Sequence, residues 1–235
     1  GLEGLAARCF YQIIAEKCYR YRFPRAIEVL NYPILSLIEK QPGIPEDSCR
    51  FLYTGTIVDS RGAFLHSKIP SYVSGVDVHL FGRFAPGLKD RLAQEMGHPS
   101  LHLEGTSEYM PFEEILGTYR RHQWRAGLAI FPSDCVYGDR ELTKFFEYMA
   151  LGVPIICSDF PAWKALVEKL GVGICVDPDS PESIGEAVRF FRDHPQEAQK
   201  MGDRAYRLAH EGFSWQSQAR NLKELYASIL EPGQD

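Results

Sequence analysis

Short apolar runs alternate with stretches of helical periodicity from residue 51 onward. Each run is rich in Val, Ile, Leu and Phe and ends near a glycine, proline, serine or aspartate, a pattern typical of buried strands. The pattern predicts strands at Phe51–Thr54, Val76–Phe81, Ser100–Glu104, Gly127–Phe131, Val153–Cys157 and Gly173–Val176.

Amphipathic stretches long enough for helices separate these strands, and three more helices follow the last one. Strands that alternate with helices need right-handed crossovers, so the sequence predicts an α/β fold: a Rossmann-like parallel sheet with helices on both faces. The expected helices are Gly62–Ile69, Gly87–Met96, Pro111–His122, Glu141–Leu151, Pro161–Leu170, Pro181–Arg192, Pro195–His210 and Trp215–Leu230, the last with Ser214 as its N-cap.

The first residues follow a different pattern. Phe10–Ala15 and Ile27–Leu30 favour two strands, with a short helix at Glu16–Arg22 between them. Two strands and one helix cannot bury a core of their own. We therefore expect residues 1–34 to be the tail of another domain and residues 35–214 to form the main domain.

Three of the predicted strands end in a glycine: Gly55, Gly82 and Gly105. Ligands of open parallel sheets bind outside the carboxyl ends of the strands. The glycines therefore mark the edge of the sheet where a ligand is expected.

Composition, apolar run length and cysteine spacing argue against several classes of function. The 26 Lys and Arg residues stand against 31 Asp and Glu residues, so no overall positive charge attracts nucleic acid. No apolar run approaches the roughly 18 residues that span a bilayer, and Gly1–Arg8 lacks the order of a secretory signal. The six cysteines have no metal-site spacing, and buried free thiols are expected at Cys157 and Cys175. A cytoplasmic protein is expected.

The segment from Tyr137 to Asp159 carries the most chemical information. If a helix opens near Glu141, Thr143 and Lys144 lie in its first turn, where free N–H groups favour an anion. Glu147 then lies on the same face, roughly 5–6 Å further along the axis, about the distance from a diphosphate to the ribose of one nucleotide. The alternative is a surface helix with a Lys–Glu ion pair worth about 0.2–0.5 kcal/mol.

The run from Thr143 to Ile156, followed by Ser158–Pro161, closely resembles the donor-site signature of glycosyltransferase family 4. The matching segments elsewhere in the chain are Asn31–Pro33, Tyr53–Gly55, Arg61–Gly62, Gly173–Asp179 and Ser214–Trp215.

This resemblance implies the C-terminal half of a GT-B fold, with residues 215–235 as a C-terminal crossover helix. It implies a retaining enzyme without metal or cofactor that transfers a sugar from a nucleotide diphosphate sugar, most commonly a UDP-sugar, to a glycan or lipid-linked acceptor. The acceptor domain would be a missing N-terminal domain or a partner chain. Any membrane contact would be peripheral, at the inner face.

The resemblance also implies roles for single residues. Glu147 corresponds to the acid that binds the ribose hydroxyls, and Asp139 to the acid that faces the donor sugar. Thr56 stands where the family commonly has an arginine, so Arg61 is the one cation retained in the phosphate loop. The loss of one charge-assisted contact costs about 1.5–3 kcal/mol of phosphate binding unless Lys144 replaces it. The expected donor-binding residues are Gly55, Thr56, Arg61, Gly82, Gly105, Thr106, Thr143, Lys144 and Glu147. The base is expected near Gly82 and near the segment Gly105–Ser107, and the expected catalytic residues are Asp139 and Lys144.

Two other motifs have simpler explanations. Asp177-Pro178-Asp179 has the D-x-D form of some metal sites, but its place between a strand and a helix favours turn and cap chemistry. The basic segment Arg120–Arg125 is either a solvated helix end or a contact for anionic lipid.

The same sequence features allow alternatives to a transferase. One is a non-catalytic subunit, or an inactive fragment, that binds the nucleotide sugar and needs a separate acceptor domain. Another is an epimerase of the same architecture, which the Thr143–Ala150 signature disfavours.

Overall fold

The computed structural model describes residues 10–230. Its centre is a parallel sheet with the strand order β5-β4-β3-β6-β7-β8. This confirms the predicted α/β fold with a Rossmann-like sheet. The strands are β3 (Arg50–Ile57), β4 (Asp77–Phe84), β5 (Leu101–Glu104), β6 (Ala126–Ala129), β7 (Ile155–Ser158) and β8 (Gly173–Val176).

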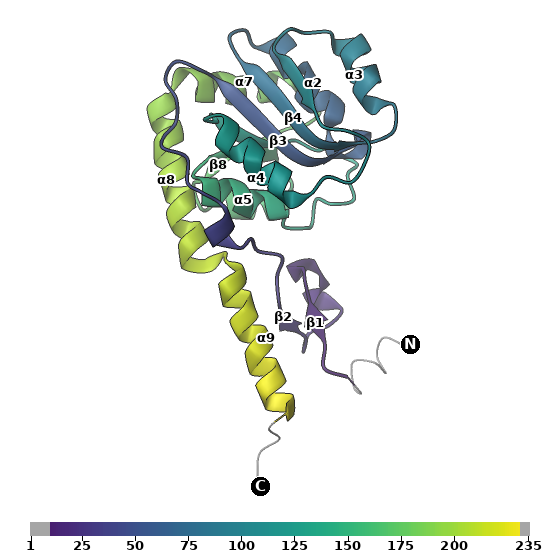
Figure 1. The fold of residues 1–235 in the computed structure, drawn as a ribbon, viewed down its shortest axis with the longest axis vertical. Helices are drawn as coiled ribbons and strands as arrows, with labels where there is room; N and C mark the ends of the chain where they lie inside the picture. The colour runs from purple at the N-terminus through teal and green to yellow at the C-terminus, as the bar shows by residue number, and fades with distance from the viewer. Residues whose placement is uncertain (1–9, 231–235) are drawn as a thin grey trace.

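Helices cover both faces of the sheet, with α2, α3 and α7 on one side and α4 and α5 on the other (Figure 1). The helix α8 runs along the edge of the domain and leads into α9, which extends away from the sheet (Figure 1). The bounds are α2 (Ala63–Tyr72), α3 (Leu88–Met96), α4 (Phe112–Arg121), α5 (Thr143–Leu151), α6 (Pro161–Val167), α7 (Pro181–Asp193), α8 (Pro195–Gly212) and α9 (Trp215–Leu230).

The core lies on both faces of the sheet. Phe51, Leu52, Val78, Ile155 and Ile156 have no exposed surface. Consecutive residues of one strand point to opposite faces, so a strand covered on both faces is apolar without interruption. This is why the strands appear in the sequence as continuous apolar runs. Among residues 10–230, no helix combines the length and apolar character needed to cross a bilayer.

The predicted ends of two central strands were wrong. β3 and β4 run on through Gly55 and Gly82, which face each other in the register, and stay paired as far as Ile57 and Phe84. Both glycines have positive φ, 111° and 152°. Glycine adopts these angles at little cost, so the strands can turn here without losing their pairing.

The neighbouring strands β3 and β6 separate early. Their register covers only Phe51 opposite Ala126 and Leu52 opposite Gly127. The Tyr148 hydroxyl fills the gap: it accepts the N–H of Thr54 at 3.2 Å and donates to the carbonyl of Leu52 at 3.2 Å. The strand order reverses between β3 and β6, and such a switch point opens a crevice at the carboxyl edge of a sheet.

Residues 10–34 form a smaller unit than predicted. Strands β1 (Ile13–Ile14) and β2 (Ile27–Glu28) pair in parallel, and the helix between them is a 3-10 turn, η1 (Lys17–Tyr21). This unit packs beside α9 (Figure 1), where Gln218 Oε1 accepts the N–H of Leu30 at 2.9 Å. The division into domains stays a prediction, and residues 1–9 and 231–235 lie outside the described part of the chain.

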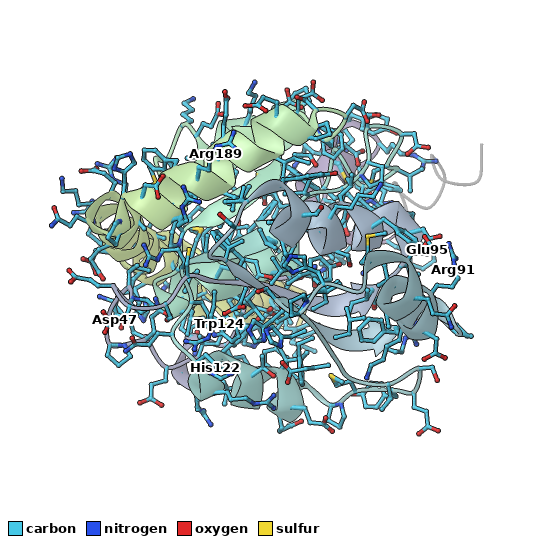
Figure 2. The ribbon with its side chains drawn as sticks, turned by 90° about the horizontal axis from the view of Figure 1, so that it is seen from above. Asp47, Arg91, Glu95, His122, Trp124 and Arg189 are labelled. Atoms are coloured by element: carbon cyan, nitrogen blue, oxygen red, sulfur yellow. The ribbon has the colours of Figure 1, made fainter. Side chains whose placement is uncertain are left out.

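The basic segment at the end of α4 does not form a continuous cationic surface. Trp124 and Arg125 are buried, and Figure 2 shows Trp124 nearer the centre of the molecule than the peripheral Arg91. The Arg125 guanidinium donates to backbone carbonyls of residues 45, 48, 191 and 192. Arg120 and Arg121 pair with Glu39 and Glu104. Each of these arginines therefore has a partner, and Arg120 and Arg121 stay exposed in the last turn of α4, as expected for a solvated helix end.

The D-x-D motif forms a turn, as expected. Asp177 Oδ1 accepts the N–H of Asp179 at 2.9 Å, and Ser180 caps α7 by accepting the N–H of Ser183 at 3.1 Å. In residues 10–230, no group of three His, Cys, Asp or Glu side chains is arranged to hold a metal ion.

The described cysteines are free thiols. Cys157 is buried as expected, whereas Cys175 is half-buried. Their sulfur atoms are 3.5 Å apart on neighbouring strands. Cys9 lies outside the described residues.

Candidate functional site

A cavity of about 380 Å³ lies at the switch point between β3 and β6. β3 and the loop after it line one side, and α5 lines the other. The cavity brings together six of the residues singled out in the sequence: Gly55, Thr56, Arg61, Thr143, Lys144 and Glu147. The first three and the last three are about 85 positions apart in the chain.

The helix α5 begins at Thr143, two residues later than the predicted start at Glu141. Residues 136–139 form a turn that the Arg140 N–H closes by donating to the carbonyl of Tyr137 at 3.0 Å, and Leu142 before the helix is extended. The N-cap residue Leu142 has no side chain that caps the helix. The Phe145 N–H donates to the carbonyl of Leu142 at 3.0 Å, so the N–H groups of Thr143 and Lys144 are the ones left for a ligand at the cavity wall.

Lys144 is held against aromatic rings at the cavity wall. Its Nζ lies 3.6 Å from the centroid of the Tyr53 ring and 5.6 Å from that of Phe131, both within the range of cation–π attraction. Burial holds the pKa of Lys144 well below its usual value of 10.5, and the nearby Arg61 lowers it further. A bound anion would relieve both effects by stabilising the charged amine.

Lys144 and Glu147 share a helix face but do not pair. In the described part of the chain, no carboxylate lies within 4.0 Å of the charged nitrogens of Lys144 or Arg61. The Arg61 guanidinium instead lies 4.9 Å from the centroid of the Tyr137 ring. This geometry excludes the alternative of a simple Lys–Glu surface pair and leaves two unpaired cations at one cavity.

The carboxylate of Glu147 is held by a tyrosine from another helix. The Tyr119 hydroxyl on α4 donates to Glu147 Oε2 at 2.7 Å, and it also lies 3.1 Å from Thr54 Oγ1. Burial raises the pKa of Glu147 above its usual value, and this effect is opposed by the Tyr119 hydrogen bond and the charge of Lys144.

The sequence did not identify Tyr119 or Thr54 as site residues. Tyr119 lies on the apolar face of an amphipathic helix, and a buried tyrosine usually has a hydrogen-bond partner for its hydroxyl. That rule indicates that a partner exists. It does not say that the partner is Glu147, which lies 28 positions further along the chain.

A second cavity of about 360 Å³ adjoins the first and shares Gly55 and Thr56 with it. Gly82 lines this second cavity together with Arg83, which the sequence analysis did not single out. Gly105 and Thr106 line neither cavity. The Thr106 hydroxyl accepts the N–H of Glu108 at 3.2 Å within its own turn.

Asp139 lies in the loop before α5 but does not line the cavity. Its side chain is 69% exposed, and Oδ1 is 3.9 Å from Nε of Arg140. Arg140 and Glu141, the next two residues, do line the cavity. A role for Asp139 at the donor sugar stays a prediction.

The chain matches the family model described as "Glycosyl transferase-like" over residues 66–224. It is 24% identical over 197 residues to the putative teichuronic acid biosynthesis glycosyltransferase TuaC of Bacillus subtilis (strain 168), a match covering 82% of this chain and 45% of that protein. It is also 24% identical over 200 residues to the D-inositol 3-phosphate glycosyltransferase of Streptomyces coelicolor, covering 80% of this chain and 42% of the relative. The chain thus spans less than half the length of these relatives.

Solved structures share the fold at low identity. Sucrose-phosphate synthase from Thermosynechococcus elongatus superposes with a TM-score of 0.79 at 16% identity, covering 99% of this chain and 61% of that chain. Anabaena Alr3699/HepE, solved in complex with UDP and glucose, superposes with a TM-score of 0.75 at 14% identity, covering 96% of this chain and 65% of that chain.

These neighbours have the GT-B fold of glycosyltransferases, and the sheet of this chain matches their Rossmann-like architecture. The family match includes α5 and five of the six strands of the sheet, β4 to β8 in chain order, and begins after β3. Because it covers more than half of the chain, this protein belongs to the glycosyl transferase-like family.

Proposed function

We propose that this chain is the donor-binding half of a retaining, metal-independent glycosyltransferase of family 4. The donor is a nucleotide diphosphate sugar, with UDP as the nucleotide, and the acceptor is a glycan or a lipid-linked glycan. The observation that carries the proposal is one cavity in which Arg61 and Lys144, two cations with no carboxylate partner among residues 10–230, lie beside the carboxylate of Glu147.

The proposed pose follows from charge and distance. The diphosphate lies between Arg61, Lys144 and the first N–H groups of α5, where helix dipole and cations both favour an anion. Glu147, about one helical turn further along, accepts hydrogen bonds from the ribose hydroxyls. The base then occupies the adjoining cavity beside Gly82.

Transfer breaks the bond between the anomeric carbon of the sugar and the diphosphate oxygen and forms a bond from that carbon to the acceptor hydroxyl oxygen, whose proton leaves with the diphosphate. Negative charge grows on that oxygen as the bond breaks, and Lys144 and Arg61 stabilise it in a partly desolvated site. Asp139 is the proposed acid facing the donor sugar from the loop before α5. Retention and metal independence follow from the resemblance of the 143–161 segment to family 4.

The relatives support the choice of substrates. One neighbour binds UDP with glucose, and another is a complex of S. aureus TarM with UDP and an N-acetylglucosamine-glycerol. We assign residues 35–214 as the donor domain, residues 1–34 as the tail of an acceptor domain and residues 215–235 as the crossover helix. The acceptor half is a further domain or a partner chain, and the assembly is proposed to work in the cytoplasm, at most peripherally on the membrane.

Replacement of Glu147 by alanine tests the ribose assignment. Hydrogen bonds to a charged group are worth about 1.5–3 kcal/mol, so Glu147→Ala is expected to weaken UDP binding by at least about 10-fold. Isothermal titration of UDP, GDP and ADP against wild type and variant measures the loss and identifies the preferred base.

Glu186→Ala is the matched control, because Glu186 is exposed on α7, on the opposite face of the sheet. Pyrophosphate, which has no ribose, is expected to bind wild type and Glu147→Ala alike. Equal UDP affinity of wild type and Glu147→Ala would refute the ribose assignment.

A non-catalytic subunit that binds nucleotide sugar is the second candidate. It shares the donor cavity, so binding does not separate the two candidates. Product analysis with a labelled UDP-sugar in the presence of the acceptor half separates the two candidates. The transferase gives a glycosylated product with retained configuration, and the non-catalytic subunit gives none. Epimerisation of the labelled sugar would point instead to an epimerase.

A further inference from the structure

A short chain of hydroxyl groups ends at the carboxylate of Glu147. Thr54 Oγ1 lies 3.1 Å from the Tyr119 hydroxyl, which lies 2.7 Å from Glu147 Oε2. The three residues come from β3, α4 and α5, so the contact joins three separate elements at the cavity.

The two hydrogen bonds of this hydroxyl network have a definite direction. A phenol has one proton, and Tyr119 donates it to the carboxylate, so the Thr54 hydroxyl must donate to the Tyr119 oxygen. Burial and the neighbouring Glu147 hold the pKa of Tyr119 well above its usual value, so the phenol stays protonated. Tyr119 is therefore a permanent donor to Glu147.

Packing fixes the donor in place. Tyr119 is 2% exposed and Thr54 is 2% exposed. The ring of Tyr119 meets that of Tyr148 edge-on, with 6.5 Å between centroids. A donor without room to move restricts the rotamers of the carboxylate that it binds.

The other oxygen of Glu147 has no such partner. Within residues 10–230, no protein group donates a hydrogen bond to Oε1, and the side chain lines the cavity. Oε1 is therefore the oxygen available to a ligand hydroxyl.

We infer that Tyr119 is a positioning residue that fixes the Glu147 carboxylate for the ribose hydroxyls and so sets the preference for ribose over deoxyribose nucleotides. The inference rests on the proposed function, because it needs a nucleotide in the cavity. Tyr119 itself acts through Glu147.

The hydrogen bond also affects the ionisation of Glu147. The groups that act on this carboxylate are Tyr119 from α4 and Lys144 from α5, and both lower its pKa. Loss of the Tyr119 hydroxyl removes one of these two pKa-lowering interactions, so the pKa of Glu147 rises. The carboxylate is ionised above its pKa, so ribose recognition is lost as pH falls, and this loss begins at higher pH in Tyr119→Phe.

The test compares UDP with 2′,3′-dideoxy-UDP by isothermal titration between pH 5 and 8. Wild type is expected to prefer UDP, and Tyr119→Phe to reduce that preference about fivefold, the value of a typical hydrogen bond, with unchanged affinity for the dideoxy nucleotide. Tyr148→Phe is the matched control: it also removes a buried phenol hydroxyl, but one that bonds to backbone groups of Leu52, Thr54 and Leu128 and not to Glu147. Thr54→Val provides a second variant, with a smaller loss in the same direction.

The outcomes separate the role of Tyr119 from the ribose assignment of Glu147. A reduced preference and an upward shift of the pH midpoint in Tyr119→Phe, with neither in Tyr148→Phe, support the inference. A preference that is lost in Glu147→Ala but intact in Tyr119→Phe and Thr54→Val overturns it and leaves the proposed function standing. Equal binding of both nucleotides by wild type overturns the ribose assignment itself.

Discussion

Replacement of Lys144 by methionine is expected to weaken UDP binding by about 100-fold. The side chain keeps its length and apolar character, so the change removes mainly the charge. One charge-assisted contact is worth about 1.5–3 kcal/mol, and the upper part of that range applies where water is largely excluded. Titration of UDP and uridine measures the effect: uridine has no phosphate and should bind both proteins alike.

Lys164→Met is the control, since Lys164 lies on α6 and pairs with Asp159 at 3.7 Å. Equal loss for uridine and UDP would contradict a phosphate contact. The free protein gives a second readout. Because the pKa of Lys144 is lowered in the folded state, its charge opposes folding at neutral pH, and Lys144→Met should raise the free energy of unfolding. This gain should shrink as pH rises toward 10.5, where the unfolded chain also loses the proton.

The largest effect on stability is expected from Gly82→Ala. A Cβ at this position would lie 1.8 Å from the carbonyl oxygen of Gly55 on the neighbouring strand. Neither backbone can move away without breaking the β3–β4 register, so we expect a loss of about 3 kcal/mol in the free energy of unfolding. For a chain of this size, that lowers the melting temperature by roughly 6–12 °C.

Gly75→Ala separates the clash from the cost of backbone angle. Gly75 has φ of +75°, and a Cβ there meets no atom within 4 Å. Its substitution should cost about 1–2 kcal/mol, the strain of a left-handed residue alone. Urea unfolding of both variants measures the difference, and equal losses would mean that the strands can separate at Gly82.

The half of the site on α5 could be predicted from the sequence, because helical spacing alone places residues 143, 144 and 147 on one face. The structure adds the position of this face opposite Gly55, Thr56 and Arg61. Sequence spacing cannot give that position, because it depends on which strands become neighbours. The absence of a Lys144–Glu147 ion pair likewise depends on surrounding groups, here Tyr53 and Tyr119.

The incorrect predictions have physical reasons of the same kind. The strand ends were placed at Gly55 and Gly82 because glycine usually interrupts a strand, but pairing with the neighbouring strand carries β3 and β4 past both residues. The basic run at Arg120–Arg125 differs from expectation only in part: Arg120 and Arg121 are exposed in the last turn of α4, as a solvated helix end would be, but Arg125 is buried among backbone carbonyls that come from distant segments.

Local patterns in the sequence determined the class of fold, the order of strands and helices along the chain, and the face of α5 that carries Lys144 and Glu147. These features depend on residues within a few positions of one another, so periodicity and turn residues are enough to fix them. Only the tertiary structure decided that β3 lies beside β6, that a cavity opens where they separate, and that Tyr119 holds Glu147. Those contacts join residues 28 to about 90 positions apart and depend on how the whole sheet packs.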